Sequence, residues 1–301
     1  MIDYATAAQR AETLVQAMPY IRKYRGKIIV IKYGGNAMVS EELKNQVMED
    51  VALLHMIGVN VVLLHGGGPE ISATLKKLGK ESRFVNGLRV TDGETIDVVQ
   101  MVLAGKVNKG LVNLLQHKGV NAVGLSGIDS RMIRAVMKDP ELGYVGRITD
   151  VDVSLLRDVM ADGYIPVISS LGCDAEGNVY NINADTAASY IAGAIGAERL
   201  FMMTDVAGIL RDKDDPDSLI PCIDIDEAVE LFNQGIISGG MIPKVDCCID
   251  AIHRGVHKVI ILDGRVSHSI LLEILTDEGV GTMVMEKREA EGDEEHDDEG
   301  T

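Results

Sequence analysis

Short runs of β-branched residues alternate along this chain with longer segments whose apolar residues recur at helical spacing. The strand-like runs occupy residues 27–32 (KIIVIK), 60–65 (NVVLLH), 121–126 (NAVGLS), 164–170 (YIPVISS) and 198–204 (ERLFMMT). Strands that alternate with helices form mainly parallel sheets covered by helices on both faces. The sequence therefore predicts a three-layer αβα sandwich, and its 301 residues are enough for one large domain or two lobes.

Two segments interrupt this alternation with the pattern of β-hairpins. Residues 83–93 (RFVNGLRVTDG) carry Asn86-Gly87 between apolar residues, which is typical of a two-residue hairpin turn. Residues 173–183 (CDAEGNVYNIN) place Gly177 between two short strand patterns. Hairpins inserted into an α/β sheet form either the wall of a pocket or a plain surface ornament, and both interpretations stay open.

An amphipathic helix is predicted ahead of the first strand. Its apolar residues recur at helical spacing from Ala7 to Ile21, with an interruption at Pro19. Because it precedes the alternating pattern, we expect it to lie outside the main core. The chain then divides into an N-terminal helix (1–25), a first lobe (26–195), a second lobe (196–285) and an acidic, disordered tail (286–301).

The charge of the chain excludes several classes of partner. It has 29 basic and 46 acidic residues, a net charge of −17, and the tail contributes −7 of this. Tryptophan is absent and aromatic residues make up only 4%. These values argue against nucleic acid and against an anionic membrane surface as partners. An anionic substrate therefore requires a pocket that is locally positive.

The cysteines indicate a reducing compartment. Cys173, Cys222, Cys247 and Cys248 include no C-x-x-C pair, so free thiols are expected and a metal site is not. The N-terminus lacks the apolar segment of a signal peptide, and no apolar run approaches the roughly 18 residues of a membrane span. We expect a cytoplasmic protein.

Glycines follow the ends of two predicted strands. Lys32 ends the first and precedes Gly34 and Gly35, and His65 ends the second and precedes three glycines. In open parallel sheets, ligands bind beyond the carboxyl ends of the strands, and a glycine loop before a helix exposes N–H groups to an anion. Alternatively, Lys32 only solvates the strand exit. His65 is more typical of a hydrogen-bonded strand end than of a catalyst.

A third glycine-rich segment is residues 236–244 (IISGGMIPK), where Gly239-Gly240 precede a helical pattern and Lys244 lies near its start. A lysine there faces the positive end of the helix dipole, which a bound phosphate would explain. The sequence contains no G-x-x-x-x-G-K-[ST], and no G-x-G-x-x-G opens the first helix, which argues against a P-loop NTPase and a standard dehydrogenase. The pattern suits phosphoryl transfer between two anions.

Six motifs together resemble those of the amino acid kinase family. In chain order they are KYGG, HGGGPE, NGLRVT, NINADTAA, TDVAGIL and GGMIPK, and the resemblance extends from about residue 10 to residue 285. It lies closest to the members that act on N-acetyl-L-glutamate. It implies the amino acid kinase fold and transfer of the γ-phosphoryl group of ATP, with Mg²⁺, to the side-chain carboxylate of that acid. This is the second step of arginine biosynthesis.

The resemblance also implies roles for individual residues. Lys32 and Lys244 match the lysines that stabilise the transition state, and Asp185 matches the aspartate that holds both; the alternative for Asp185 is a plain acid at a helix start. The residues that match contacts to the acetylated acid are Gly67, Gly68, Arg89 and Asn181. Those that match contacts to the phosphates and nucleotide are Gly34, Gly35, Thr204, Asp205, Gly208, Leu210, Gly239 and Gly240. The first lobe then binds the acid and the second binds ATP.

The two ends of the chain resemble the arginine-sensitive members of the family. In those members, N-terminal helices join dimers into a hexamer, a trimer of dimers. The resemblance implies allosteric inhibition by L-arginine. Such a site needs a carboxylate for the guanidinium group, for which Glu273 is the candidate, and donors for the carboxylate of arginine, for which Tyr20 and His268 are weaker candidates. The alternative is that residues 268–284 only build the last helix–strand unit. Binding of a nitrogen-signalling protein stays open.

Three other functions compete with this interpretation. One is another acid kinase of the family, acting on a carrier-linked aminoadipate. Another is a catalytically silent arginine-sensing protein of the same fold, against which the presence of Lys32, Asp185 and Lys244 argues. A dehydrogenase is the most distant, and nicotinamide binding would reveal it.

Overall fold

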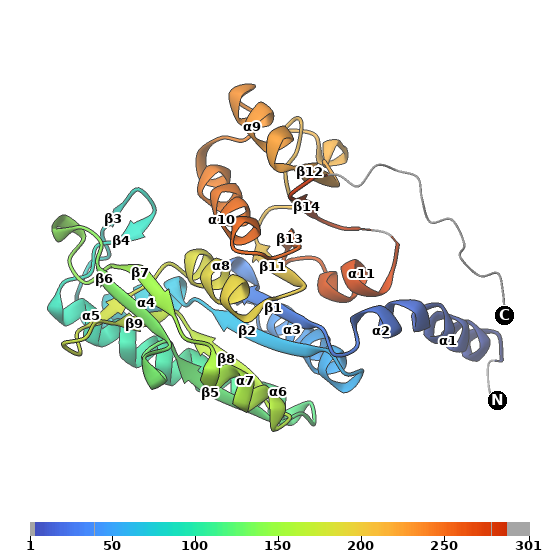
Figure 1. Cartoon of the computed structure of the whole chain (residues 1–301), viewed down its shortest axis with the longest axis horizontal. Coiled ribbons are helices and arrows are strands. Elements are labelled where there is room, and N and C mark those ends of the chain that lie inside the picture. The colour runs from blue at the N-terminus through green and yellow to red at the C-terminus, as the bar shows by residue number, and fades with distance from the viewer. Residues whose placement is uncertain (1–3, 39, 278, 288–301) are drawn as a thin grey trace.

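An eight-stranded sheet forms the centre of the protein (Figure 1). This computed structural model describes residues 4–38, 40–277 and 279–287, so most of the predicted tail lies outside the described residues. The strands, from edge to edge, are β12 (Cys222–Asp224), β14 (Thr282–Met285), β13 (Lys258–Asp263), β11 (Arg199–Thr204), β1 (Ile28–Tyr33), β2 (Asn60–His65), β8 (Ile165–Ser169) and β5 (Ala122–Ser126). Neighbours run parallel except β13 and β14, which confirms the predicted sheet.

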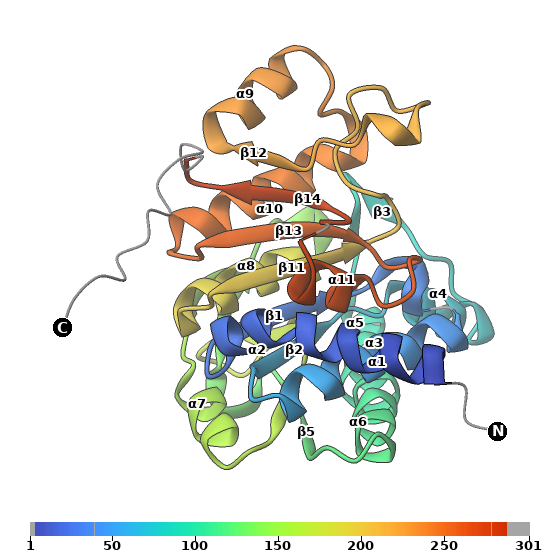
Figure 2. The same ribbon diagram turned by 90° about the vertical axis from the view of Figure 1, so that its right-hand side faces the viewer.

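Helices cover both faces of the sheet and produce the predicted three layers (Figure 2). The helices of one face are α2 (Met18–Tyr24), α3 (Glu41–Met56), α4 (Gly68–Lys77), α5 (Gly93–Gln100), α6 (Asn108–His117) and α11 (Ser269–Leu275). Those of the other are α7 (Ser154–Ala161), α8 (Ala184–Ile195), α9 (Ile225–Asn233) and α10 (Ile242–His253).

Strand β1 divides its side chains between the two apolar cores. Ile29 and Ile31 enter the core beneath α3, and Val30 enters the core beneath α8 and α10. Since side chains alternate along a strand, Lys32 belongs to the same face as Val30. The strand therefore directs its last lysine toward α8 and α10.

Both predicted hairpins are present. β3 (Phe84–Val85) and β4 (Leu88–Arg89) pair around Asn86 and Gly87, whose φ angles of 49° and 76° are those of the expected turn. β9 (Leu171–Cys173) and β10 (Val179–Asn181) form the second hairpin. They join β6 (Ile133–Met137) and β7 (Gly146–Val151), for which the sequence made no prediction, in a sheet of order β10-β9-β6-β7.

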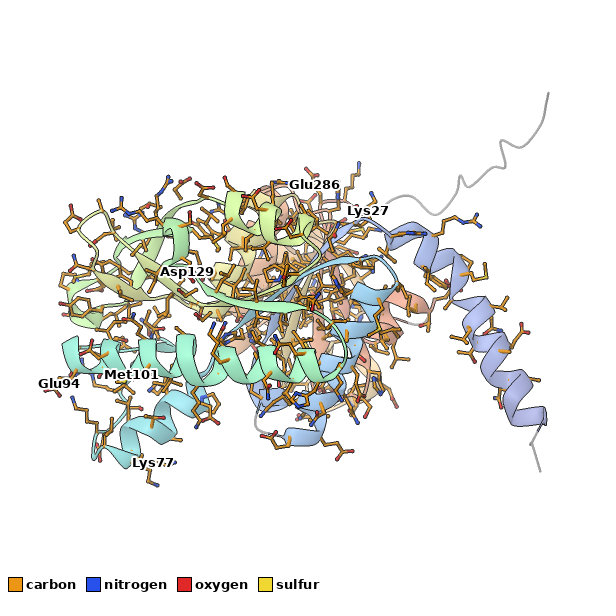
Figure 3. The ribbon with its side chains drawn as sticks, turned by 90° about the horizontal axis from the view of Figure 1, so that it is seen from below. Lys27, Lys77, Glu94, Met101, Asp129 and Glu286 are labelled. Atoms are coloured by element: carbon orange, nitrogen blue, oxygen red, sulfur yellow. The ribbon has the colours of Figure 1, made fainter. Side chains whose placement is uncertain are left out.

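A single long helical rod runs beneath the sheet, with Glu94 near its start and Met101 within it (Figure 3). It consists of α5, a π-helical segment η2 (Met101–Val107) and α6. At the junction the N–H of Asn108 reaches the carbonyl oxygen of Leu103, five residues back. The remaining elements are short 3₁₀ turns: η1 (Gly35–Met38), η3 (Asp129–Arg131), η4 (Pro140–Leu142), η5 (Pro216–Ser218) and η6 (Gly239–Met241).

The N-terminal segment forms two helices instead of one, because the pattern breaks at Ala17. Pro19 is the second residue of α2, where its missing N–H removes no intrahelical bond. Helix α1 (Tyr4–Gln16) projects from the body (Figure 1). Tyr24, by contrast, is buried, and Arg199 lies 4.9 Å from its ring centre. Within the described ranges, no helix has the length and apolar character that crossing a membrane requires.

Candidate active site

Two lysines converge on one aspartate at the carboxyl end of β1. The Nζ atom of Lys32 lies 2.7 Å from Asp185 Oδ1, and the Nζ atom of Lys244 lies 3.4 Å from Asp185 Oδ2. Lys32 also donates to the carbonyl oxygen of Met203 at 3.4 Å. The three side chains come from β1, α8 and α10. The structure thus brings together the three residues that the sequence predicted as catalytic.

The starts of two helices position this group. Asn183 caps α8, since its side chain accepts the N–H of Thr186 at 3.0 Å, and this places Asp185 in the first turn. Lys244 occupies the first turn of α10, directly after Pro243. A cation at that position opposes the helix dipole. The carboxylate of Asp185 compensates for the unfavourable placement of Lys244.

The charges of the three groups sustain one another. Burial by itself would raise the pKa of Asp185, but the ammonium groups of Lys32 and Lys244 outweigh burial and hold that pKa below its ordinary value. Asp185 is therefore ionised at neutral pH. Two positive groups around one carboxylate leave a net positive charge, which provides the locally positive site that an anionic substrate requires.

Gly34 is in contact with the Lys32 ammonium. A Cβ atom on Gly34 would lie 2.7 Å from Lys32 Nζ, so any other residue would displace the lysine. Gly35 adopts a φ of +69° and approaches the backbone of Thr204 and Asp205. The first glycine loop therefore lies between the Lys32 ammonium and the end of β11.

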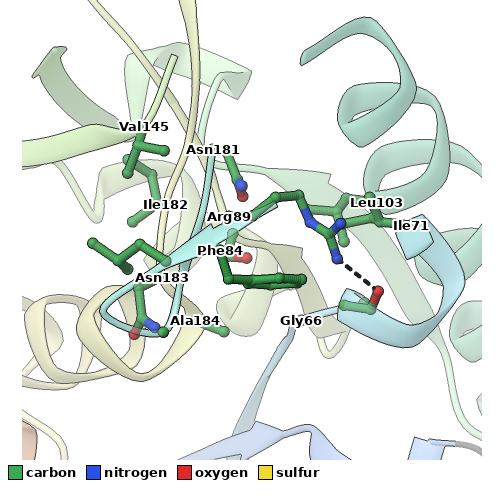
Figure 4. Close-up of a pocket in the computed structure, with 15 residues that line it drawn as sticks. Gly66, Ile71, Phe84, Arg89, Leu103, Val145, Asn181, Ile182, Asn183 and Ala184 are labelled. Atoms are coloured by element: carbon green, nitrogen blue, oxygen red, sulfur yellow. Dashed lines mark hydrogen bonds between the residues drawn. The ribbon is translucent and has the colours of Figure 1, made fainter. Parts of the chain in front are cut away.

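A pocket opens next to the charged group, beneath the β3–β4 hairpin (Figure 4). Its lining includes all four residues that the sequence predicted for the acid, namely Gly67, Gly68, Arg89 and Asn181. Asn183 and Ala184, which directly precede Asp185, also line it. The pocket and the charged group are therefore parts of one site. The hairpin supplies a wall of this pocket and is not a surface ornament.

Arg89 is fixed at one side of the pocket. Its guanidinium donates to Ser82 Oγ at 2.6 Å, to Ser72 Oγ at 2.8 Å and to the carbonyl oxygen of Gly68 at 3.0 Å, and the last bond is drawn in Figure 4. Its centre lies 4.7 Å from the ring centre of Phe84. A guanidinium has five N–H donors, so these three bonds leave two for a ligand. Both Nη2 hydrogens are used, so the Nε–H and one Nη1–H remain, and these donors on a fixed positive charge suit an anionic group.

Asn181 reaches the pocket from β10. Its Nδ2 donates to Thr91 Oγ1 at 3.4 Å, and Thr91 donates in turn to the carbonyl oxygen of Arg89 at 2.8 Å. Gly68 begins α4, and the first N–H groups of a helix have no intrahelical acceptor. The second glycine loop therefore presents N–H donors at the pocket wall.

His65 supports this loop from behind and does not reach the pocket. It is completely buried, its Nδ1 lies 2.8 Å from the carbonyl oxygen of Gly66, and its Nε2 lies 3.1 Å from Asn108 Nδ2. Burial lowers the pKa of His65 to about 4, so the ring is neutral at physiological pH. It is the hydrogen-bonded strand-end residue that the sequence favoured.

The residues predicted for the nucleotide lie at the end of β11, in the loop that follows it, and directly before α10. Thr204 ends β11, where its carbonyl oxygen accepts the N–H of Gly264 at 2.8 Å, and Asp205 follows it. Gly208, with a φ of +152°, and Leu210 belong to the loop after β11. Gly239 and Gly240 form η6, immediately before the helix of Lys244. Within the described residues, no cluster of three or more His, Cys, Asp and Glu side chains could hold a metal ion.

The three residues predicted for arginine already have partners within the subunit. His268 Nδ1 lies 2.6 Å from the buried Asp50 carboxylate. A hydrogen bond from Tyr20 to Asp277 raises the pKa of Tyr20. Glu273 is buried and accepts the N–H of Val280 at 3.1 Å.

Sequence reasoning did not identify the side chains that support the pocket. Ser72 and Ser82 hold Arg89, and Thr91 links Asn181 to the Arg89 backbone. Serines in a helix and in a loop carry no pattern that distinguishes them from solvated residues. Thr91 lay within the quoted NGLRVT motif, so its place beside Arg89 was the one available signal.

Comparisons with known proteins agree on one family. Residues 27–263 match the pattern described as the amino acid kinase family. Acetylglutamate kinase of Brachyspira hyodysenteriae is 55% identical over 91% of this chain and 96% of its own, and that of Clostridioides difficile is 52% identical over 93% and 99%. The solved N-acetylglutamate synthase from Neisseria gonorrhoeae, complexed with coenzyme A and N-acetyl-glutamate, superposes with a TM-score of 0.79. It is 27% identical, over 92% of this chain and 64% of that longer one.

The buried neutral His65 predicts a pH dependence of stability. The pKa of His65 in the folded protein, about 4, lies below its ordinary value of 6.5. Above pH 6.5 the ring is neutral in both the folded and the unfolded chain. As the pH falls from 6.5 toward 4, only the unfolded chain takes up the proton, so the free energy of unfolding decreases. The loss amounts to on the order of 3 kcal/mol of unfolding free energy. Urea unfolding between pH 4.5 and 7 should show a shallower pH dependence for His65→Gln than for the exposed control His253→Gln. Equal slopes would contradict the assignment.

Proposed function

The chain belongs to the amino acid kinase family, and we propose that Lys32, Asp185 and Lys244 form its phosphoryl-transfer centre. The protein is a kinase that phosphorylates the side-chain carboxylate of N-acetyl-L-glutamate. The observation that carries this function is the 55% identity to a curated acetylglutamate kinase over nearly the whole length of both chains. As part of the proposal, the product is N-acetyl-L-glutamyl 5-phosphate and the reaction is the second step of arginine biosynthesis.

The chemistry needs charge neutralisation more than a base. The substrate carboxylate is ionised at pH 7, so one of its oxygens forms a bond to the γ-phosphorus of ATP while the bond to the ADP oxygen breaks, and no proton moves. The obstacle is the approach of one anion to another, which positioning and fixed positive charges overcome. Lys32 and Lys244 supply those charges, and Asp185 holds both ammonium groups beside the acid pocket.

Mg²⁺ would be carried by the phosphates of ATP. Asp185 already pairs with two lysines, which makes it a poor metal ligand. Mg²⁺ commonly keeps several waters and takes few protein ligands at phosphate-transfer sites. When bound, it would neutralise phosphate charge in addition to the two lysines.

A hydroxamate assay tests the function. Purified protein with ATP, N-acetyl-L-glutamate and hydroxylamine should yield the acyl hydroxamate, whereas a carrier-linked aminoadipate should yield none. Lys32→Ala and Lys244→Ala should each lower kcat by roughly 10²–10³, because each removes a charge that acts on the transferred group. The control is Lys27→Ala, an exposed lysine just before β1, which should keep its activity. Near-normal turnover by either site variant would remove that lysine from the mechanism.

Arg89 is proposed to bind the α-carboxylate of the acid. The support is its fixed guanidinium in the pocket wall and its two remaining donors. Asn181 and the N–H groups of Gly67 and Gly68 complete the proposed acid site. The nucleotide is proposed to lie on the other side of Lys32, against Gly34 and Gly35, residues 204–210, and η6.

Arg89→Ala should raise the KM for N-acetyl-L-glutamate on the order of 10- to 100-fold, because it removes a fixed positive charge and its remaining hydrogen-bond donors from the pocket. The KM for ATP should stay within about twofold, since the hairpin is remote from the proposed nucleotide contacts. Steady-state kinetics measure both, with the exposed Arg83→Ala as the control. A comparable rise in both KM values would show that Arg89 supports the fold and not the acid.

We propose that α1 joins subunits into a hexamer and that L-arginine binds near the junction of α2 and α11. Leu14, Val15 and Met18 expose between 56% and 71% of their surface, an apolar surface suited to a partner subunit. Tyr20 lies on α2, His268 is the N-cap residue of α11, and Glu273 lies within α11. The free thiols of all four cysteines suit the cytoplasm.

Deletion of residues 1–16 tests the assembly. Because α1 projects from the body while Tyr24 of α2 is buried, the truncated enzyme should stay folded and active. Light scattering should show its mass fall from hexamer to dimer, and inhibition curves should show weaker arginine inhibition, since effector and assembly are linked. A truncated protein that stays hexameric and fully arginine-sensitive would contradict the model.

A further inference from the structure

The π-helical segment η2 brings two side chains onto one face of the long helix. Leu103 and Asn108 are five residues apart, which in an α-helix would separate them by about 140°. The N–H of Asn108 reaches the carbonyl oxygens of both Gly105 and Leu103, and the bond to Leu103, five residues back, is the π-helical one that turns the two side chains toward one face. Leu103 lies against the second glycine loop, and Asn108 lies against His65, which directly precedes that loop.

Leu103 contacts this loop directly. A Cβ atom on Gly67 would lie 2.6 Å from Leu103 Cδ2, so the helix packs against the bare backbone of Gly67. Leu103 also lines the acid pocket. The helix therefore limits how far the loop can move away from the pocket.

Asn108 reaches the loop through His65. Asn108 is completely buried, and the two hydrogens of its Nδ2 are shared among three acceptors, Val167 O at 2.8 Å, Leu125 O at 3.1 Å and His65 Nε2 at 3.1 Å. The reversed amide would place its oxygen against two carbonyl oxygens, so the orientation is determined. Its Oδ1 finds no hydrogen-bond partner among the described residues. The side-chain amide of Asn108 therefore makes hydrogen bonds only through its NH₂ group.

These contacts select one tautomer of His65. Because Nε2 accepts a hydrogen bond from Asn108, the ring proton lies on Nδ1, which donates it to the carbonyl oxygen of Gly66. In a trans peptide the C=O and N–H groups point in opposite directions. A Gly66 carbonyl held toward His65 therefore directs the N–H of Gly67 away from it.

We propose that Asn108 is a positioning residue for acid binding, which fixes the His65 tautomer and thereby aims the Gly67 N–H into the pocket. This inference rests on the proposed function of the pocket. Without Asn108, His65 can take the Nε2-protonated form and release the Gly66 carbonyl. The Gly66–Gly67 peptide is then free to rotate, and the acid loses a donor.

A purely structural role makes different predictions. Asn108 also ties α6 to β5 and β8 through Leu125 and Val167, so its loss will lower stability in either case. Only the positioning role couples Asn108 to the proton on His65 and to the KM of one substrate.

The experiment combines NMR of ¹⁵N-histidine-labelled protein with kinetics. In the wild-type enzyme, two-bond ¹H–¹⁵N spectra should show His65 protonated on Nδ1, with the signal assigned by its absence in His65→Gln. In Asn108→Ala the ring should populate the Nε2-protonated form, and the KM for N-acetyl-L-glutamate should rise about tenfold or more while that for ATP stays within about twofold. Asn113→Ala, an exposed asparagine of the same helix, should change neither.

Each outcome decides a separate point. An Nε2-protonated His65 in the wild-type enzyme would overturn the proposal, and this measurement stands even where Asn108→Ala does not fold. A folded Asn108→Ala with an unchanged KM for the acid would overturn it as well. A wild-type protein that shows the expected tautomer but does not phosphorylate the acid would refute the proposed function instead.

Discussion

The site depends on keeping two like charges close together. Lys32 and Lys244 would repel one another if both ammonium groups faced one small volume, and Asp185 makes that placement stable by pairing with each. The rest of the fold serves this arrangement. The central position of β1 holds Lys32, the first turns of α8 and α10 hold the other two, and Gly34 leaves the space that the Lys32 ammonium needs.

A positive site within an acidic protein has a further effect. The chain carries a net charge of −17, so it exerts no net attraction on an approaching anion, and salt screens most of its field beyond a Debye length of about 10 Å. Only at close range do the lysines and Arg89 dominate. Selectivity among anions therefore comes from contacts inside the pocket and not from attraction over a distance.

Features with local causes were predictable from the sequence, and features caused by packing were not. Alternating strand and helix patterns predicted the parallel sheet, and Asn86-Gly87 predicted the hairpin, because a turn with two positive φ angles favours those residues. The glycine loops and the family motifs located Lys32, Asp185 and Lys244. Strands β6 and β7 depend on distant partners, as do the packing of the π turn against Gly67 and the bonds of Ser72 and Ser82 to Arg89. No short stretch of sequence encodes those contacts.

The position of β1 between β2 and β11 also determines how much of the chain must be synthesised before the catalytic centre can form. One edge of β1 pairs with β2, which follows about thirty residues later, but its other edge pairs with β11, more than 160 residues further along the chain. Until β11 has been made, an apolar strand edge has no native partner, and the Lys32 ammonium lacks the Met203 carbonyl. Lys244 arrives later still. A nascent chain therefore contains every residue of the acid pocket well before it contains Lys244, and until β11 is made the unpaired edge of β1 is open to aggregation.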